Sequence, residues 1–427
     1  MSKDGWMARS VDRPGSSYEE LYARWEASNW SATAIDFSRD ASDWVDELDE
    51  VQRMGALWNY SMFLHGVQGV ARALSPMIDA APDTSQALFL STQIADEARN
   101  RVFLDRFLRE VAGQGHDPRS TILAVDSHLT WGFKQIFSEL QRLSDELRRK
   151  PGDRAVLAQT VALSHIIVEG VLAIPGEHFI QRYVLRHGIL PGFSKGLAAI
   201  SQDEERHVGF GTRMLRELIT ASIDCRSAVI ETWDRVLPWM VGVFVPPDLD
   251  RAYVECFDFR LEEIYGFGLH SLETKMVQVG IDPSELFLLS LDDRSLSYEE
   301  RAARTLTLVE AGIVGDDRRE PVVTHEALEI LFEGTTRALD VETARAVGGP
   351  IEWAFTDHEP WHVIVVDDHV EAKPGSAGAQ ALQLEISSGD WAKIAVRRVD
   401  PRRALLTRRL RVHGHWQAKA KLAKLFN

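Results

Sequence analysis

Apolar residues recur at helical spacing through the first two thirds of the chain. Between about residues 43 and 74 they follow one another at intervals of three and four, which predicts a long helix that stops before Pro76. Breaks rich in proline, glycine and polar residues separate further segments of this kind, and Asp83 or Thr84 is the expected N-cap of the next helix. We expect further helices over about 18–30, 84–112, 119–149, 153–187, 193–223, 226–244 and 249–279. Together these segments predict a helical domain over residues 1–300.

The pattern changes near residue 300. The segment from about residue 282 to residue 316 is rich in charged residues and has a helical pattern. Residues 315–321 have the composition of a linker, and we place the linker between the two domains at 301–324. Alternating or β-branched apolar residues then appear for the first time. We expect helices over about 324–345, 390–396 and 417–426, and strands over about 351–355, 361–366, 370–372, 381–386 and 405–412. The predicted fold class is mainly α, a helical bundle followed by a small α+β domain over residues 325–427.

Composition narrows the possible partners and location. The chain has 427 residues, 45% of them hydrophobic, which is enough for two domains with ample cores. A net charge of −16 argues against nucleic acid and anionic membrane surfaces as main partners. With only Cys225 and Cys256, no disulfide framework is expected, as in a cytoplasmic protein. The first 17 residues have no apolar signal core, and the apolar stretch 237–245 is too short for a membrane span.

Candidate chemistry begins with Glu204 and His207. Three residues apart on a predicted helix, they share a face, and a helical bundle can direct such a pair to a metal ion. Glu97 begins a motif of the same shape, with Asn100 in the second position, and Glu169 stands alone in an apolar run. A buried carboxylate needs a partner, and a metal ion is the simplest single partner for all these acids. For the isolated Glu204 and His207 motif, two solvated side chains remain the alternative.

Several motifs, in their order and spacing, carry a resemblance to known families. In the bundle these motifs are LYARW at 21–25, QIADEAR at 93–99, VEGVLA at 168–173, ILPG at 189–192 and DEERH at 203–207. Residues 20 to about 280 resemble the ferritin-like superfamily, in the branch of ribonucleotide reductase small subunits and ligand-binding oxidases. Through DPRRALL at 400–406 and LRVHG at 410–414, residues from about 325 to 427 resemble a sterol-carrier-protein domain. That resemblance implies a five-stranded sheet with helices over an apolar lipid tunnel.

The resemblance to the ferritin-like family implies two metal ions held by six side chains, of which four are present here. The four metal ligands that it implies are Glu97, Glu169, Glu204 and His207. Asn100 stands where the family has its other histidine, and Val67, or Gln68 in a shifted register, stands at its first carboxylate. The two missing ligands belong to one metal, so we expect one metal per chain in preference to two. Three carboxylates and one imidazole suit iron, manganese or zinc.

Other residues are candidates for roles at this site. Asn100 is a catalytic candidate, because its amide can donate a hydrogen bond to a bound oxygen species or ligate weakly through its oxygen. His165 lies four residues before Glu169 and shares its helix face, so it is a candidate to reach the metal, to support a ligand or simply to pack. His65 and His178 are weaker candidates.

Residues tied to two other family activities are absent. Phe103 and Leu104 occupy the turn where the reductase subunit has its radical tyrosine, so we do not expect ribonucleotide reduction. Ser164 and Gly69 occupy the positions of the tyrosine–valine cross-link of the ligand-binding oxidases, so we do not expect that cross-link.

Two functions follow as hypotheses. The first is an iron- or manganese-dependent oxidase or monooxygenase acting on a small hydrophobic or acyl-type molecule, with Gly66, Gly69 and Gly170 leaving room near the metal. The second is a non-catalytic protein that binds lipid or another hydrophobic ligand at a decayed metal site. The C-terminal domain either binds lipid in its tunnel or serves as a docking module. The resemblance also implies a homodimer, and the enzyme hypothesis adds an electron-donor protein as a possible partner.

Overall fold

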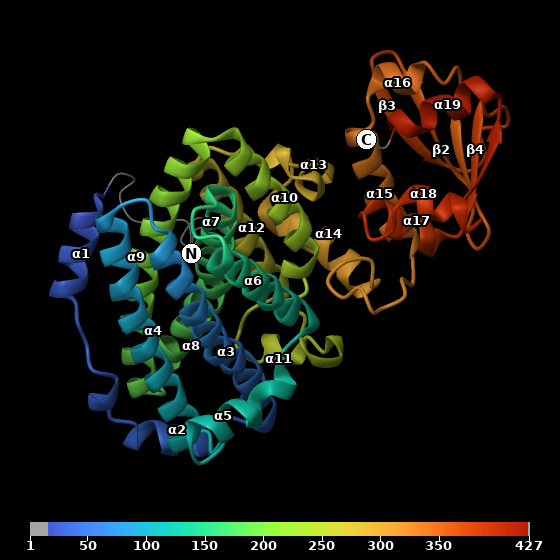
Figure 1. Ribbon diagram of the computed structural model, residues 1–427. Helices are drawn as coiled ribbons and strands as arrows, with labels where there is room; N and C mark the ends of the chain where they lie inside the picture. The colour runs from blue at the N-terminus through green and yellow to red at the C-terminus, as the bar shows by residue number, and fades with distance from the viewer. Residues whose placement is uncertain (1–15, 426–427) are drawn as a thin grey trace. The chain divides into compact units, whose positions relative to one another are not determined.

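The protein consists of two compact units, Met1–Pro283 and Ser284–Asn427 (Figure 1). The structure is a computed structural model that describes residues 16–425. The first unit is helical, and the second combines helices with a small sheet. The predicted fold class is therefore confirmed.

The helices of the first unit follow the predicted segments closely. They are α1 Tyr18–Ala27, α2 Ser38–Asp46, α3 Glu50–Ala80, α4 Thr84–Glu110, α5 Pro118–Val125, α6 Trp131–Arg149, α7 Arg154–Val161, α8 Ile174–His187, α9 Pro191–Ala221, α10 Ile223–Met240, α11 Ala252–Glu255 and α12 Leu261–Val279. A π-helix, Ala162–Ala173, joins α7 to α8. Short 3₁₀ turns occur at Ala32–Ala34, Asp126–His128 and Pro247–Leu249. The expected helices at 119–149 and 249–279 are each divided in two.

Capping and proline chemistry explain where α3 and α4 end. Asp83 caps α4, accepting a hydrogen bond from the Gln86 amide at 3.0 Å, as predicted. The prediction that α3 stops before Pro76 was wrong, because the helix continues to Ala80. A proline has no N–H for the carbonyl four residues earlier, which here belongs to Arg72. Arg148 Nη2 donates to that carbonyl instead, at 2.9 Å, so the helix loses little by continuing.

The stretch from Arg154 to His187 is the most apolar long helical segment of the described chain. By length and composition alone it could cross a membrane, but 78% of its apolar window is buried inside the unit. The sequence argument about membrane spans had considered only 237–245. Such burial is typical of a helix in the core of a domain. Glu169 lies in the π-helical part of this segment.

An aromatic core fixes α3, α4 and α9 against one another. The ring of Phe193 on α9 lies 4.4 Å from Phe107 on α4 and 4.6 Å from Tyr60 on α3, centroid to centroid. Gly196 allows the ring of Phe103 to lie directly against α9, where a Cβ would clash. These contacts hold the helices that carry the candidate site in a fixed relation.

The second unit surrounds a five-stranded sheet of order β3-β2-β1-β4-β5, in which only β1 and β4 run parallel. Its strands are β1 Ile351–Phe355, β2 Trp361–Val366, β3 His369–Pro374, β4 Leu382–Ile386 and β5 Arg411–Gly414. Its helices are α13 Phe287–Leu291, α14 Tyr298–Glu310, α15 His325–Ala338, α16 Val341–Arg345, α17 Ser388–Ala395, α18 Pro401–Leu406 and α19 Trp416–Leu425. The ring of Phe332 on α15 stacks on Trp361 at 4.7 Å and packs against Trp353 and Trp391.

Two sequence expectations differ from the second unit. A strand was expected over 405–412, but the chain forms α18 and begins β5 only at Arg411. Asp400 starts α18 by accepting a hydrogen bond from the Arg402 amide at 2.7 Å, with Pro401 in the first turn. The region expected as a linker, 301–324, contains most of α14, which belongs to the second unit.

Candidate metal centre

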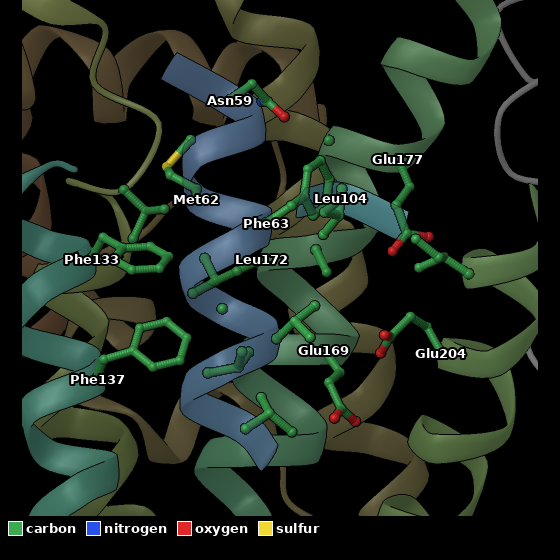
Figure 2. Close-up of a pocket in the computed structure, with 18 of the residues that line it drawn as sticks. Asn59, Met62, Phe63, Leu104, Phe133, Phe137, Glu169, Leu172, Glu177 and Glu204 are labelled. Atoms are coloured by element: carbon green, nitrogen blue, oxygen red, sulfur yellow. The ribbon is translucent and has the colours of Figure 1, made fainter. Parts of the chain in front are cut away.

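An apolar cavity lies inside the first unit, and part of its wall is acidic (Figure 2). The space between its lining atoms, including the part that is open to solvent, amounts to about 750 Å³. Much of the lining consists of rings and aliphatic side chains from α3, α6 and the π-helix, including Phe63, Phe133, Phe137 and Leu172. The acidic lining residues are Glu97, Glu169, Glu177 and Glu204.

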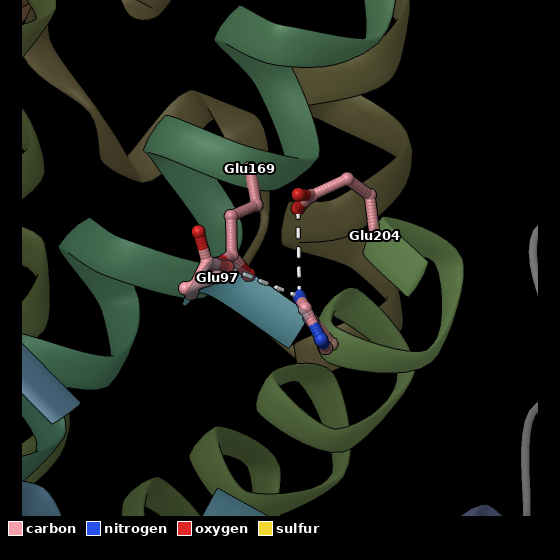
Figure 3. Close-up of side chains that lie close together, drawn as sticks. Glu97, Glu169 and Glu204 are labelled. Carbon is pink, nitrogen blue, oxygen red and sulfur yellow. Dashed lines mark ion pairs between the residues drawn. The ribbon is translucent and has the colours of Figure 1, made fainter. Parts of the chain in front are cut away.

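Three of these carboxylates meet one histidine at the cavity wall (Figure 3). The four residues are Glu97, Glu169, Glu204 and His207, and one ligand atom from each lies within 4.8 Å of the others. Glu97 comes from α4 and Glu169 from the π-helix, while α9 supplies the other two. All four side chains are buried. The structure therefore brings together the four residues that the sequence analysis selected as ligands.

The unpaired atoms of these residues fit a cation. Each of the four residues has a buried atom with no hydrogen-bond partner among the described residues: Glu97 Oε1, Glu169 Oε2, Glu204 Oε2 and His207 Nδ1. His207 Nδ1 lies 3.5 Å from Glu97 Oε1 and 3.6 Å from Glu204 Oε2, close but not hydrogen-bonded. Buried polar atoms without partners are costly. Three carboxylates and an imidazole form a donor set that iron or manganese accepts.

The electrostatics of the cluster also favour a cation. Burial raises the pKa of Glu97 and of Glu169 well above the usual range of a glutamate, and the nearby Glu204 carboxylate adds to the rise. Burial lowers the pKa of His207, but its contacts with Asp96 and Glu204 outweigh burial, so that this pKa is raised well above its usual value. Protons therefore balance the buried negative charge, and a bound metal ion would displace them.

A buried hydrogen bond orients His207. Its Nε2 lies 3.1 Å from Asp96 Oδ2, which leaves Nδ1 facing the glutamates. Asp96 also accepts from Trp25 Nε1 at 2.9 Å, and it pairs with Arg99 and Arg206. Sequence analysis did not select Asp96, although its position beside Glu97 in the same motif was a signal. In the same network Asp203, next to Glu204, pairs with both arginines and accepts from Trp30 Nε1 at 2.9 Å.

His165 does not reach the four-residue cluster. Its Nε2 lies 2.9 Å from Gln93 Oε1, and Gln93 Nε2 in turn donates to Glu169 Oε1 at 2.8 Å. Burial lowers the pKa of His165 to about 3, so the ring is neutral at physiological pH. Its position therefore matches the supporting role that the sequence left open. Gln93, one helical turn before Glu97, is a further supporting residue that the sequence analysis did not select.

The positions of the two missing ligands are buried and are not acidic. Asn100 is fully buried on α4, and neither atom of its side-chain amide has a hydrogen-bond partner in the described range 16–425. Val67 lines the cavity, whereas Gln68 accepts a hydrogen bond from Arg101. Of the two registers considered, the structure therefore favours Val67 as the position facing the site. His65 and His178 lie elsewhere, the first near the Ile122 carbonyl and the second stacked on Phe267.

Of the three glycines expected to leave room near the metal, only Gly66 lines the cavity. The space beside Gly69 is filled by the ring of Phe137, and the space beside Gly170 by the stem of Lys275. That expectation was wrong for Gly69 and Gly170, because residues distant in sequence pack against both.

Residues 16–233, about half of the chain, match the family model of the ribonucleotide reductase small chain. The chain belongs to the ribonucleotide reductase small-chain family. Residues 333–427 match the model of the SCP-2 sterol transfer family, so the protein also carries a domain of that family. Both resemblances inferred from the sequence are confirmed.

Solved structures of other proteins have the same fold as the helical bundle of this protein. Two variants of an R2-like ligand-binding oxidase, one with an aerobically and one with an anaerobically reconstituted Mn/Fe cofactor, each share 20% sequence identity with it. Each superposition has a TM-score of 0.54 and covers 65% of this chain and 98% of the oxidase. At this identity the similarity establishes a common fold.

Proposed function

We propose that this protein is an iron- or manganese-dependent oxidase that acts on a small hydrophobic or acyl-type molecule and holds one metal ion per chain. The observation that carries the proposal is the convergence of four buried, unpaired ligand atoms on one wall of an apolar cavity. The R2-like ligand-binding oxidases of the same fold carry a Mn/Fe cofactor, which supports a redox metal here.

Different residues would hold the metal, orient its ligands and contact the substrate at such a site. Glu97, Glu169, Glu204 and His207 would hold the metal, which when bound supplies one-electron and dioxygen chemistry. Asp96 holds His207 in the tautomer that leaves Nδ1 free, and Gln93 orients Glu169. Phe133 and Phe137 provide an apolar surface for the substrate on the cavity wall. Asn100 offers a buried amide one helical turn after Glu97, as a hydrogen-bond donor or a weak ligand.

A non-catalytic binding protein is the second candidate. The replacement of two family ligands by Val67 and Asn100 favours it. In that case the protein retains the cavity and binds a hydrophobic ligand, while protons on the glutamates neutralise the cluster.

The remaining proposals concern the second unit and the partners. We propose that the SCP-2 domain binds lipid, with docking as its alternative role. We further propose that the protein is cytoplasmic, where its two free cysteines, Cys225 and Cys256, stay reduced. A homodimer and an electron-donor protein complete the proposal.

Metal analysis separates these functions. Protein from iron- and manganese-supplemented culture is analysed by mass spectrometry for metal per chain, beside the variants Glu204→Ala and Glu205→Ala. Glu205 is the matched control because it neighbours Glu204 but is exposed. We expect about one metal per chain in the wild type and in the Glu205 variant, and none in the Glu204 variant. Absence of metal from all three would leave the binding protein, and two metals would overturn the one-metal site.

A further inference from the structure

Glu177 is a fourth carboxylate of the cavity, and it lies outside the proposed metal cluster. Figure 2 shows its carboxyl group on the same side of the cavity as those of Glu169 and Glu204, with the rings of Phe133 and Phe137 on the other side. It extends from the first turn of α8, two turns beyond Glu169. The four ligand atoms that lie within 4.8 Å of one another do not include it.

The carboxyl group of Glu177 is buried and only half satisfied. The residue is 6% exposed. Its Oε2 accepts a hydrogen bond from Ser201 Oγ at 2.7 Å, while the buried Oε1 has no hydrogen-bond partner in the part of the chain that the structure describes. No ion pair among the described residues includes it. An unsatisfied buried group of this kind costs roughly 1–3 kcal/mol, so its retention in a cavity wall points to a ligand that supplies the missing hydrogen bond.

A second unpaired polar atom faces the neighbouring glycine. Asn59 Oδ1 is buried and has no hydrogen-bond partner within residues 16–425, and a Cβ built on Gly176 would lie 3.5 Å from it. Asn59 and Gly176 line both this cavity and an adjoining apolar one, which Phe179 and Phe257 also line. The polar groups at Glu177 and Asn59 thus interrupt an otherwise apolar lining between the metal cluster and the second cavity.

We propose that Glu177 binds a hydroxyl group carried by an otherwise apolar substrate. A hydroxyl both donates and accepts, so it satisfies Oε1 whether the carboxyl group is ionised or protonated. It is also neutral, which suits a wall that already holds three other carboxylates. The aliphatic part of the molecule then lies against the phenylalanine rings. The substrate class is therefore an aliphatic or alicyclic alcohol; this deepens the proposed function and rests on it.

The role predicted for Glu177 is to anchor and orient the substrate. A hydroxyl fixed at Glu177 places the carbons next to it along the wall toward Glu204 and Glu169. An alkane of equal length lacks the hydrogen bond and gains only the apolar contacts. Glu177 therefore distinguishes oxygenated from purely hydrocarbon ligands, and its loss affects the two classes differently.

Binding of 1-octanol and of octane to the full-length protein tests the proposal. Headspace gas chromatography measures both affinities, with the protein metal-loaded and again after chelation, so that direct coordination of the alcohol to metal is separated from binding at Glu177. We expect Glu177→Leu to weaken 1-octanol binding about tenfold and to leave octane binding unchanged, since one hydrogen bond of roughly 1.4 kcal/mol is lost. Glu177→Gln keeps a donor and an acceptor and should stay within about threefold of the wild type.

The controls make either result decisive. Glu26→Gln, at an exposed acid of α1 that lines neither cavity, should leave both affinities unchanged. Wild-type affinity of Glu177→Leu for 1-octanol would overturn the proposal, as would an equal loss of 1-octanol and octane. Octanol binding in the expected pattern, in a protein without oxygen-dependent turnover, would refute the proposed oxidase while leaving the role of Glu177 intact.

Discussion

At the scale of single residues, Val67 and Asn100 are the basis of the proposal that the cluster holds one metal ion. Both are buried, one on the cavity wall and the other one helical turn after Glu97. Neither offers the carboxylate or imidazole that a second ion needs. The proposed count of one metal ion per chain therefore rests on these two residues.

We expect the double variant Val67→Glu/Asn100→His to bind two metal ions per chain, because it supplies both missing ligands. Either single variant should stay at one. The matched control is Gln68→Glu/Asn100→His, since Gln68 faces Arg101 instead of the cavity. Metal analysis of purified protein provides the measurement. A gain in the control, or no gain in the double variant, would show that these positions do not form the second site.

Lys275 predicts a dependence of stability on pH. Burial lowers its pKa from 10.5 to about 8, and its ammonium has Ser271 Oγ as a hydrogen-bond partner at 3.1 Å. Between these two pH values the unfolded chain binds more protons than the folded chain, so the free energy of unfolding rises with pH across that window. Below pH 8 both states are protonated, and the cost of burying the charge is fully present.

Relative to Lys275→Met, the wild type should therefore gain about 2 kcal/mol of stability between pH 7.5 and 9.5. Urea unfolding at both pH values measures the difference. Lys195→Met, at an exposed lysine of α9, is the control and should show no such change relative to the wild type. Parallel behaviour of the wild type and the Lys275 variant at both pH values would contradict the buried charge.

At the scale of elements, the π-helix and α9 determine the geometry of the cluster together. The π-helix carries Glu169 and His165, while α9 carries Glu204 and His207. Gly211 makes their close approach possible, because a Cβ there would lie within 3.0 Å of His165. The contact between these elements thus supports the chain of hydrogen bonds from His165 through Gln93 to Glu169.

Gly211→Ala should destabilise the protein by about 1–3 kcal/mol, the usual cost of forcing a methyl group into a packed interior. Gly152→Ala is the control, since nothing lies within 4 Å of a Cβ at that turn. It should change stability by no more than about 0.5 kcal/mol. Chemical denaturation of both variants compares them. Equal stability would mean that the helices separate freely to admit the methyl group.

At the scale of the whole molecule, the candidate metal site and the SCP-2 domain belong to different units. All four proposed ligands, and all the residues named as lining the two cavities, belong to Met1–Pro283. The aromatic core of Phe332, Trp353, Trp361 and Trp391 belongs to the second unit. The proposed metal ligands and the SCP-2 domain therefore lie in different units of the chain.

A fragment of residues 1–283 should bind as much metal per chain as the full-length protein, because it keeps every proposed ligand and its supporting residues. Metal analysis, with circular dichroism to verify that the fragment is helical, provides the measurement. A helical fragment that has lost its metal would show that the second unit contributes to the site.

By itself the sequence determined the parts of this protein that depend on local spacing. Glu204 and His207 share a helix face because they are three residues apart. Asp83 caps α4 by accepting a hydrogen bond from the amide of Gln86, three residues later in the chain. The order of the family motifs gave the bundle and the SCP-2 domain. Those features need no knowledge of distant contacts.

Only the tertiary structure decided which distant residues complete or close the site. Asp96 reaches His207 across 111 positions in sequence, and Phe137 fills the space beside Gly69. Arg148 satisfies the carbonyl that Pro76 leaves free, which lets α3 continue where local rules predicted its end. Glu177 carried the same signal as Glu169, an acid in an apolar segment, but its place on the cavity wall depends on how α8 packs. Such features depend on hydrogen bonds and packing between helices. Those contacts form only in the folded protein and cannot be read from spacing along the chain.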